Sequence, residues 1–223
     1  MKYRIKFSKV GRIRFIGHLD LLKVFQRAVK RGEIPISYSN GFNPHQLMGF
    51  AIPLPLGMAS VGEYIDIEIK EEMPSDEIMY RLNEVMPEGI EILAVRKFTK
   101  NDKSCAAIVE AALYEITLDE KIVDFSRIIK NMFLQESFEI EKISKRKTKI
   151  ADIKPDIFSL DELQNDNVTV FKTVISTGSQ RNLKPELLVK YIYKYIGKEY
   201  EPLKIKYKRI EILKNADGKF LPL

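Results

Sequence analysis

The feature that most constrains the fold of this 223-residue chain is an order of strands and helices that occurs twice. Residues 2–10 alternate apolar and charged side chains, as a half-buried strand does, and residues 18–30 place apolar side chains at helical spacing. The same patterns then predict strands at 45–54 and 63–70, a helix at 74–86 and a strand at 89–98. The resulting order, β-α-β-β-α-β, is that of the ferredoxin-like fold.

The second half of the chain repeats this order. Its patterns predict, in turn, a strand at 106–118, a helix at 121–135, strands at 150–160 and 168–176, a helix at 184–196 and a strand at 202–213. Residues 138–144 are left over as an additional edge strand, and residues 214–223 read as a turn and a tail. A repeat of about 100 residues indicates a duplicated domain rather than a solenoid. We therefore expect an α+β protein of two tandem ferredoxin-like domains with antiparallel sheets, 1–100 and 105–223, with the boundary in the polar segment 98–104.

The charge of the chain favours an anionic partner. The net charge is +6 and the isoelectric point is about 9.1, which favours association with RNA, DNA or acidic lipid. Residues 1–31 hold ten Lys or Arg and a single acid, Asp20, whereas residues 63–91 are mostly acidic. A second basic cluster, interrupted only by Asp152, consists of Lys142, Lys145, Arg146, Lys147, Lys149 and Lys154. Either cluster alone is compatible with an ordinary solvated surface, but two clusters on a basic chain favour a nucleic-acid-binding face.

The cysteine count and the hydropathy limit the other classes. Cys105 is the only cysteine, so neither an internal disulfide nor a cysteine-rich metal site is expected, and nothing around it in the sequence marks a reactive thiol. No apolar run approaches the roughly 20 residues that span a bilayer, and the first residues lack the apolar core of a signal peptide. We expect a cytoplasmic protein without a cofactor.

Both histidines lie between residues 17 and 45. His18 precedes a helix, and it could act as a general base near neutral pH, with Arg12, Arg14 or Lys23 stabilising a phosphorane-like charge. The alternative is a helix-entry histidine that caps backbone amides or packs under a loop. A metal site that joins His18 to His45 is not expected, because this pair lacks the spacing of zinc ligands.

Residues 38–45, "YSNGFNPH", form a turn-rich loop around Asn40-Gly41. Exposed aromatic side chains beside amides and cations can stack on the bases of single-stranded RNA and hold its phosphates. The alternative is that Phe42 packs into the core and the loop only closes the domain. The residues predicted to contact RNA in this half of the chain are Arg12, Arg14, Lys23, Arg27, Tyr38, Asn40, Phe42, Asn43 and His45.

The second half contains one candidate anion-binding site, at residues 176–187, "STGSQRNLKPEL". Small and polar residues lead there into a helix whose first turn contains Pro185, and free amides at such a helix start can bind a phosphate. Arg181 and Lys184 lie beside it, and Lys154 in the neighbouring predicted strand could point to the same region. The alternative is an ordinary loop and helix cap.

Several of these segments resemble a known family. The stretches "RIKFSKVGRIRFIGHLDLLKVFQRAVKR", "ISYSNGFNPHQLMGFAIPLPLG" and "GEYIDIEI", with "DIKPDIFSL" and "TGSQRNLKPELL" in the second half, resemble the radical SAM-linked protein family. Its members are domains of unknown function encoded beside, or fused to, a cobalamin-binding radical SAM protein. The resemblance covers nearly the whole chain and implies an accessory role beside such an enzyme. The iron–sulfur cluster would belong to the partner, because a cluster needs several thiolates and this chain has one.

A looser resemblance exists to the endoribonucleases that process CRISPR repeat RNA. Tandem ferredoxin-like domains with basic faces are similar to those proteins, and His18 lies near the position of their histidine. The sequence departs from their pattern at residues 195–205, "YIGKEYEPLKI", which hold one glycine where those proteins carry a glycine-rich loop.

Three functional classes therefore remain. The first is a non-catalytic accessory protein that binds tRNA, rRNA or another RNA for a radical SAM enzyme. The second is a metal-independent endoribonuclease that uses His18. The third is a protein-interaction partner whose basic faces meet acidic surfaces of the enzyme. An enzyme is not the expected class, because no paired catalytic carboxylates, nucleophile elbow or phosphate-loop motif is found. The sequence carries no signal for the oligomeric state.

Overall fold

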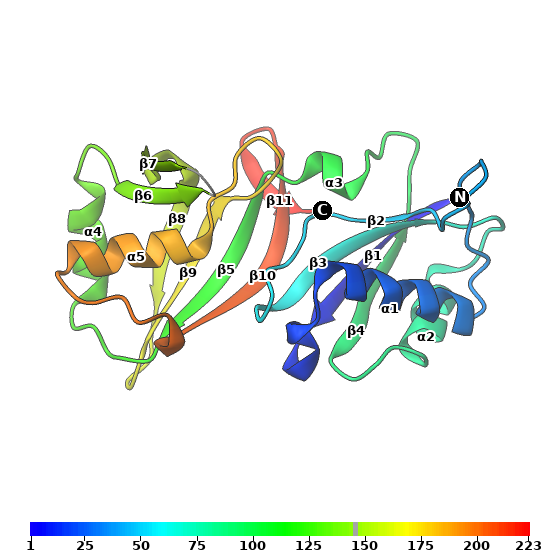
Figure 1. The fold of residues 1–223 in the computed structure, drawn as a ribbon, viewed down its shortest axis with the longest axis horizontal. Coiled ribbons are helices and arrows are strands. Elements are labelled where there is room, and N and C mark those ends of the chain that lie inside the picture. The colour runs from blue at the N-terminus through cyan, green and yellow to red at the C-terminus, as the bar shows by residue number, and fades with distance from the viewer. Residues whose placement is uncertain (145–146) are drawn as a thin grey trace. The chain divides into compact units, whose positions relative to one another are not determined.

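The computed structural model describes residues 1–144 and 147–223 and divides them into two compact units (Figure 1). The first unit consists of Met1–Val109 together with Arg209–Leu223, and the second of Glu110–Lys208. The predicted domains 1–100 and 105–223 are corrected in two respects. The first segment extends to Val109, and the chain returns to the first unit for its last residues.

The first unit contains an antiparallel sheet with the strand order β4-β1-β3-β2. The end of the chain adds to it, because β10 is hydrogen-bonded to β3 and β11 to β10. The elements of this unit are β1 (Lys2–Lys9), a 3-10 helix η1 (Gly11–Phe15), α1 (His18–Arg31), β2 (Met48–Phe50), β3 (Ala59–Glu68), α2 (Ser75–Asn83), β4 (Ile90–Lys97), α3 (Cys105–Ile108), most of β10 (Ile205–Ala216) and β11 (Lys219–Pro222).

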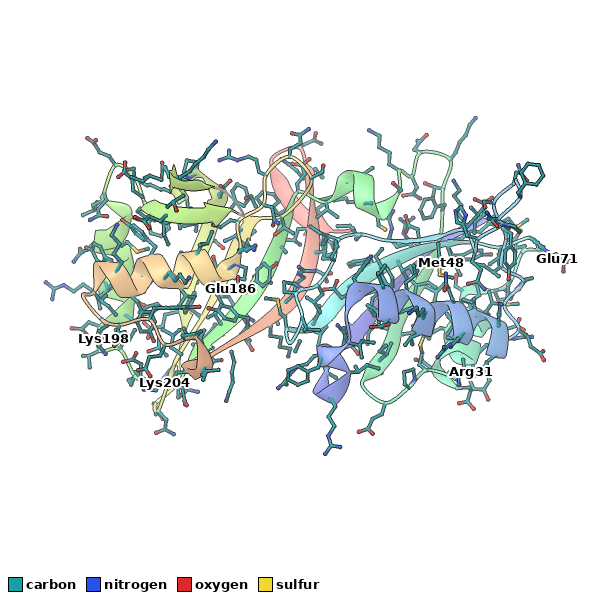
Figure 2. All side chains as sticks on the ribbon, in the orientation of Figure 1. Arg31, Met48, Glu71, Glu186, Lys198 and Lys204 are labelled. Carbon is teal, nitrogen blue, oxygen red and sulfur yellow. The ribbon has the colours of Figure 1, made fainter. Side chains whose placement is uncertain are left out.

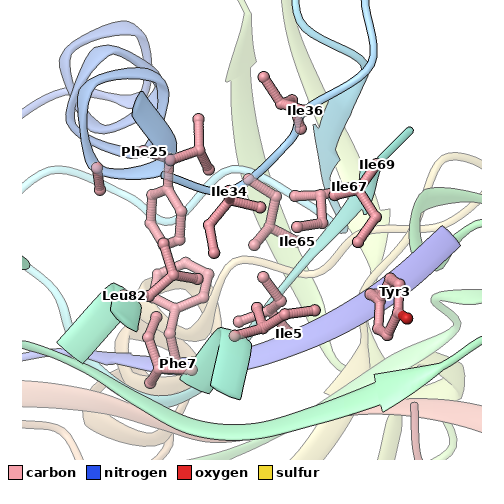
Figure 3. Close-up of a cluster of buried hydrophobic side chains, with 14 of the residues drawn as sticks. Tyr3, Ile5, Phe7, Phe25, Ile34, Ile36, Ile65, Ile67, Ile69 and Leu82 are labelled. Carbon is pink, nitrogen blue, oxygen red and sulfur yellow. The ribbon is translucent and has the colours of Figure 1, made fainter. Parts of the chain in front are cut away.

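The core of the first unit lies between this sheet and the helices α1 and α2 (Figure 3). The apolar positions predicted for β1 are confirmed as core, since Tyr3, Ile5 and Phe7 are buried, but the alternation is incomplete because Arg4 between them is buried as well. The helix α1 contributes Phe25, whose ring meets that of Phe7 edge to face at a centroid distance of 4.8 Å. This packing holds α1 against the sheet along one stripe, and the opposite side of the helix faces solvent.

Gly62 allows the end of the chain to approach β3. A Cβ atom at this position would lie 2.3 Å from the carbonyl oxygen of Ile210, so a larger residue does not fit. Directly beside it, Arg209 donates to both carboxylate oxygens of Glu63 at 3.1 Å, and both side chains are buried. These contacts explain why β10 beyond Lys208 belongs to the first unit.

The second unit has the strand order β10-β5-β9-β8, in which β5–β9 and β9–β8 are antiparallel. A separate two-stranded sheet, β6–β7, is inserted between α4 and β8. The elements of this unit are β5 (Ala111–Leu118), α4 (Phe125–Phe133), β6 (Glu139–Ser144), β7 (Lys147–Asp152), η2 (Lys154–Asp156), β8 (Ile157–Leu163), β9 (Thr169–Ser176), α5 (Pro185–Tyr195) and η3 (Pro202–Lys204).

The mixed α+β class is confirmed, whereas some predicted elements differ. The strand expected at 106–118 is preceded by the short helix α3, which buries Cys105 and lets Val109 pack with Tyr64. The strand expected at 150–160 is interrupted at Lys154–Asp156, because Pro155 lacks the amide hydrogen that a sheet needs. The edge strand expected at 138–144 pairs with β7 instead. In the described part of the chain, no helix is both long and apolar enough to cross a membrane.

Candidate nucleic-acid interface

The solvent side of α1 carries a row of cations. Lys23, Arg27, Lys30 and Arg31 recur at helical spacing and are all exposed, opposite the buried residues of the helix. A hollow of about 420 Å³ is lined by the last three of them together with Val24 and Pro87. Figure 2 shows Arg31 at the end of α1. The prediction named Lys23 and Arg27 but omitted Lys30 and Arg31, although the same spacing places them on this side.

Two of these cations have neither an ion pair nor a side-chain hydrogen bond in the described part of the chain. Lys23 lies 3.3 Å from Asp20, and both are exposed, while Arg31 donates to the carbonyl oxygen of Val85. Within the described residues, neither Arg27 nor Lys30 forms an ion pair or a side-chain hydrogen bond. Their hydrogen-bonding capacity therefore remains available to an anion.

The loop at residues 38–45 presents a fully exposed aromatic ring. Ser39 and His45 close its base: their backbones pair at 2.8 Å, and the Ser39 hydroxyl lies 2.8 Å from His45 Nδ1. Above them, Gly41 has a positive φ of 113°, which glycine adopts readily. Phe42 has a relative exposure of 106%, so the alternative in which it packs into the core is not the one observed. Asn40 and Asn43 beside it are exposed as well.

The base of this loop is joined to α1. Tyr38 forms a bridge with Gln46, and the amide of Gln46 donates to the carbonyl oxygen of Gln26 at 3.3 Å. Tyr38 itself is 40% exposed. Because Lys23 and Arg31 are eight residues apart, the row of cations extends over roughly 12 Å of α1, which runs from η1 at its start toward the loop beyond its end (Figure 1).

Arg12 and Arg14 lie in η1, beside exposed apolar side chains. The Arg14 guanidinium lies over the ring of Phe15 at 4.8 Å, and the backbone amide of Gly57 donates to the Arg14 carbonyl oxygen at 3.0 Å. Phe15 and Leu56 are 59% and 68% exposed, and Leu19 follows on the first turn of α1. We call Phe15, Leu19 and Leu56 the η1 patch. Arg14 thus contacts the η1 patch at its Phe15 ring, at the end of α1 opposite the loop.

His18 is the first residue of α1 and packs against an aromatic ring. Its ring meets that of Phe50 edge to face at a centroid distance of 5.2 Å. Within the described residues, no hydrogen bond to this imidazole is found. The contact with Phe50 is compatible with the packing role that was considered as the alternative to catalysis. The same residues contain no cluster of three His, Cys, Asp or Glu side chains that could hold a metal ion.

Two of the three cations predicted in the second unit are engaged by the protein itself. The Lys154 ammonium donates to the carbonyl oxygens of Phe133 and Gln135 and so satisfies the end of α4. Arg181 forms an ion pair with the buried carboxylate of Asp156 at 2.8 Å. Lys184 is exposed at the start of α5. Of the basic cluster that begins at Lys142, Lys145 and Arg146 lie outside the described residues, and so do the side chains of Lys142 and Lys147.

The sequence analysis did not predict that Lys9 is buried and bonds to the backbone of η1. The ammonium of Lys9 donates to the carbonyl oxygens of Ile16 at 2.8 Å and Arg14 at 3.3 Å. Burial lowers the pKa of Lys9, and burial raises the pKa of Glu63 against the opposing effect of Arg209. The signal was present in the sequence, because Lys9 falls on the same alternate positions as Tyr3, Ile5 and Phe7.

Cys105 is a packed thiol, as the sequence suggested. It is buried, its thiol donates to the carbonyl oxygen of Gly49 at 3.4 Å, and burial raises its pKa to about 12. A thiol with such a pKa is protonated near neutral pH and a poor nucleophile.

Comparisons with known proteins give a family and a fold. No curated protein matches the chain. Among solved structures, a chain of the "Crystal Structure of a Cbf5-Nop10-Gar1 Complex" is similar with 11% identity and a TM-score of 0.52 over 96% of this chain and 50% of that chain. The present chain thus spans half the length of that neighbour, and the likeness shows a mixed α+β fold alone.

An unknown protein from Galdieria sulphuraria is also matched, with 11% identity over 95% of this chain and 98% of that one, but its TM-score of 0.27 carries no argument. The decisive match is to a family model, which covers residues 2–185. The chain therefore belongs to the family described as "Uncharacterized protein conserved in bacteria (DUF2344)".

Proposed function

We propose that this protein is a cytoplasmic, non-catalytic accessory protein that binds single-stranded RNA through the loop 38–45 and the cations of α1. The observation that carries the proposal is the full exposure of Phe42 on a loop whose base is closed by Ser39 and His45. An aromatic ring held in water gains by stacking on a base, and every base offers a flat face. Exposed aromatic rings on ordered loops are used in this way for single-stranded nucleic acid.

The cations of α1 supply the second half of such a site. Arg27 and Lys30 are exposed and free of ion pairs in the described structure, and the hollow beside them is wide enough for a phosphate group. An RNA strand whose base stacks on Phe42 could place its next phosphates along α1. Phosphate contacts would provide affinity without sequence preference.

The experiment is a titration of a fluorescent single-stranded RNA with the full-length protein at low salt. We expect Phe42→Ala to weaken binding by about 1–3 kcal/mol, which is the usual loss for one base-stacking ring. Phe158→Ala is the matched control, because Phe158 is also an exposed phenylalanine but lies on β8 in the second unit. Equal affinities for the wild type and Phe42→Ala, or no RNA binding at all, would refute the proposal.

A second candidate function, docking to a partner enzyme, is supported by the η1 patch. Apolar side chains exposed as far as Phe15, Leu19 and Leu56 are typical of protein interfaces when they lie together, and arginine is favoured at such interfaces. The resemblance to radical SAM-linked proteins supports a radical SAM enzyme as this partner. The surface would then fit an apolar pocket bordered by carboxylates.

This candidate is tested by co-purification with the radical SAM protein encoded nearest to this chain. We expect Leu56→Asp to abolish the complex, because it adds a charge to the apolar surface, while RNA binding stays unchanged. Leu134→Asp is the control, since Leu134 is 82% exposed but lies after α4 in the second unit. A complex that survives Leu56→Asp would argue against docking through the η1 patch.

The finer fold assignment is also a proposal. The orders β4-β1-β3-β2 and β10-β5-β9-β8 support two ferredoxin-like units, because each corresponds to fourth-first-third-second in a β-α-β-β-α-β series. In the second unit the hairpin β6–β7 would then be an insertion. Such a unit leaves one sheet face free of its own helices, where a ligand or another segment can bind.

A further inference from the structure

The first unit contains a pocket of about 420 Å³ that the proposed function does not use. It lies where β2 and the outer side of β3 meet the segment that leads into α3. Leu47, Met48, Ile67 and Phe98 give it an apolar lining, and its polar side chains are those of Lys2, Ser104 and the acids Asp66, Glu68 and Asp102. A mostly apolar pocket of this size with a few polar groups is the usual form of a small-ligand site.

Two of the three acids are already satisfied by the protein. Asp66 accepts hydrogen bonds from the buried side chain of Arg4 at 2.9 and 3.2 Å and from the backbone amide of Cys105 at 2.6 Å. Asp102 accepts from Arg96 at 2.7 and 3.0 Å and from Thr99. These bonds hold the walls of the pocket, and they leave neither carboxylate free for a ligand.

Glu68 is the acid that remains available. Its carboxylate forms an ion pair with the exposed Lys2 at 3.8 Å, a distance too long for a hydrogen bond; within the described residues it accepts no side-chain hydrogen bond, and its side chain is 35% exposed. An ionised carboxylate is an acceptor with two oxygens side by side, so its natural partner carries two adjacent N–H donors. Lys2 offsets the charge of Glu68, and Arg4 and Arg96 pair with the other two acids, so the pocket favours an uncharged ring over a charged group.

Among nucleobases, guanine fits this requirement. Its Watson–Crick edge presents a ring N–H and an amino group next to each other, whereas adenine and cytosine place an acceptor nitrogen beside their amino group and uracil places carbonyl oxygens on both sides of its N–H. The pocket wall begins at Leu47, two residues after the loop that carries Phe42. We propose that this pocket binds a guanine base of single-stranded RNA, with Glu68 accepting from its two adjacent N–H groups and the apolar wall covering the ring. That the guanine comes from RNA rests on the proposed function, whereas guanine binding by the pocket can be tested without RNA.

The first test titrates the full-length protein with guanosine, which carries no phosphate, and follows the amide resonances of residues 47–49 and 66–68 by NMR. Guanosine is expected to bind at least about tenfold more tightly than inosine, which lacks the amino group, because a donor to a charged acceptor is lost. Adenosine should bind no better than inosine. Glu68→Gln should remove the preference for guanosine, and Glu91→Gln, at an exposed position on β4, should retain it.

The second test compares RNAs that differ only by guanine or inosine at one position. Preference for the guanine RNA that is lost in Glu68→Gln supports the inference. RNA binding that depends on Phe42 but is indifferent to guanine, with no guanosine binding, would overturn the pocket assignment and keep the proposed function. Guanosine binding that depends on Glu68 without any RNA binding would support the pocket and reject RNA as the source of the base.

Discussion

At the scale of single residues, the sequence predicted the burial of some side chains but not the residues that they contact. Cys105 was expected to be a packed thiol, and it is buried. The sequence did not predict whether Phe42 is exposed or packs into the core, because turn-forming residues do not determine the direction of a neighbouring side chain. The pairing of Glu63 with Arg209 was not predictable, since 146 positions separate the two residues.

Cys105 gives a prediction at this scale. Its folded pKa of about 12 lies above its ordinary value of 9.0, so the folded state holds the proton that an unfolded thiol releases above pH 9. The thiol therefore lowers the stability of the folded state as the pH rises from 9 to 12. We expect Cys105→Ala to reduce this loss by roughly 1 kcal/mol at pH 10, measured as the free energy of unfolding in urea at pH 7.5 and pH 10.

A direct check uses alkylation by iodoacetamide at pH 8. The native protein should react far more slowly than the urea-unfolded protein, because the thiol is both buried and protonated. Equal rates in the two states would contradict the burial of Cys105.

At the scale of elements, periodicity located most strands and helices but not their interruptions. The spacing of apolar residues predicted α1, and its buried face is the expected one. The short helix α3 was read as part of a strand, because four residues are too few to show a helical period. Of the hairpin β6–β7, the first strand was predicted at 138–144, but its pairing with β7 was not, because a local pattern does not identify a strand's partner.

Gly62 provides the prediction for elements. Gly62→Ala would place a methyl group against the backbone of Ile210, and neither strand can move without disturbing the sheet. We expect a loss of about 1–3 kcal/mol or more in the free energy of unfolding. Gly49→Ala is the control on β2, since its added Cβ would meet no atom within 4 Å. Equal stability of the two variants would show that β10 does not pack against β3 as described.

At the scale of the whole molecule, the repeated element order predicted two units but not the course of the last residues. Residues 209–223 return to the first unit through Gly62, the Glu63–Arg209 pair and the hydrogen bond from Tyr64 to Glu211 at 2.7 Å. These are contacts between residues far apart in sequence, and no local pattern encodes them. The candidate interface was likewise predicted only in part. The sequence shows where the cations lie along the chain, but it does not show which of them form ion pairs or hydrogen bonds within the protein.

The measurement that tests the central claim most directly is the salt dependence of RNA binding. Each single-strand phosphate contact contributes about 0.7 to the slope of log affinity against log salt, so Arg27→Ala with Lys30→Ala should lower that slope by about 1.4. The control pair is Lys70→Ala with Lys100→Ala, two exposed cations of the first unit that lie off α1 and should leave the slope unchanged. An unchanged slope in the Arg27 and Lys30 variant, or equal losses in both variants, would contradict an RNA interface on α1.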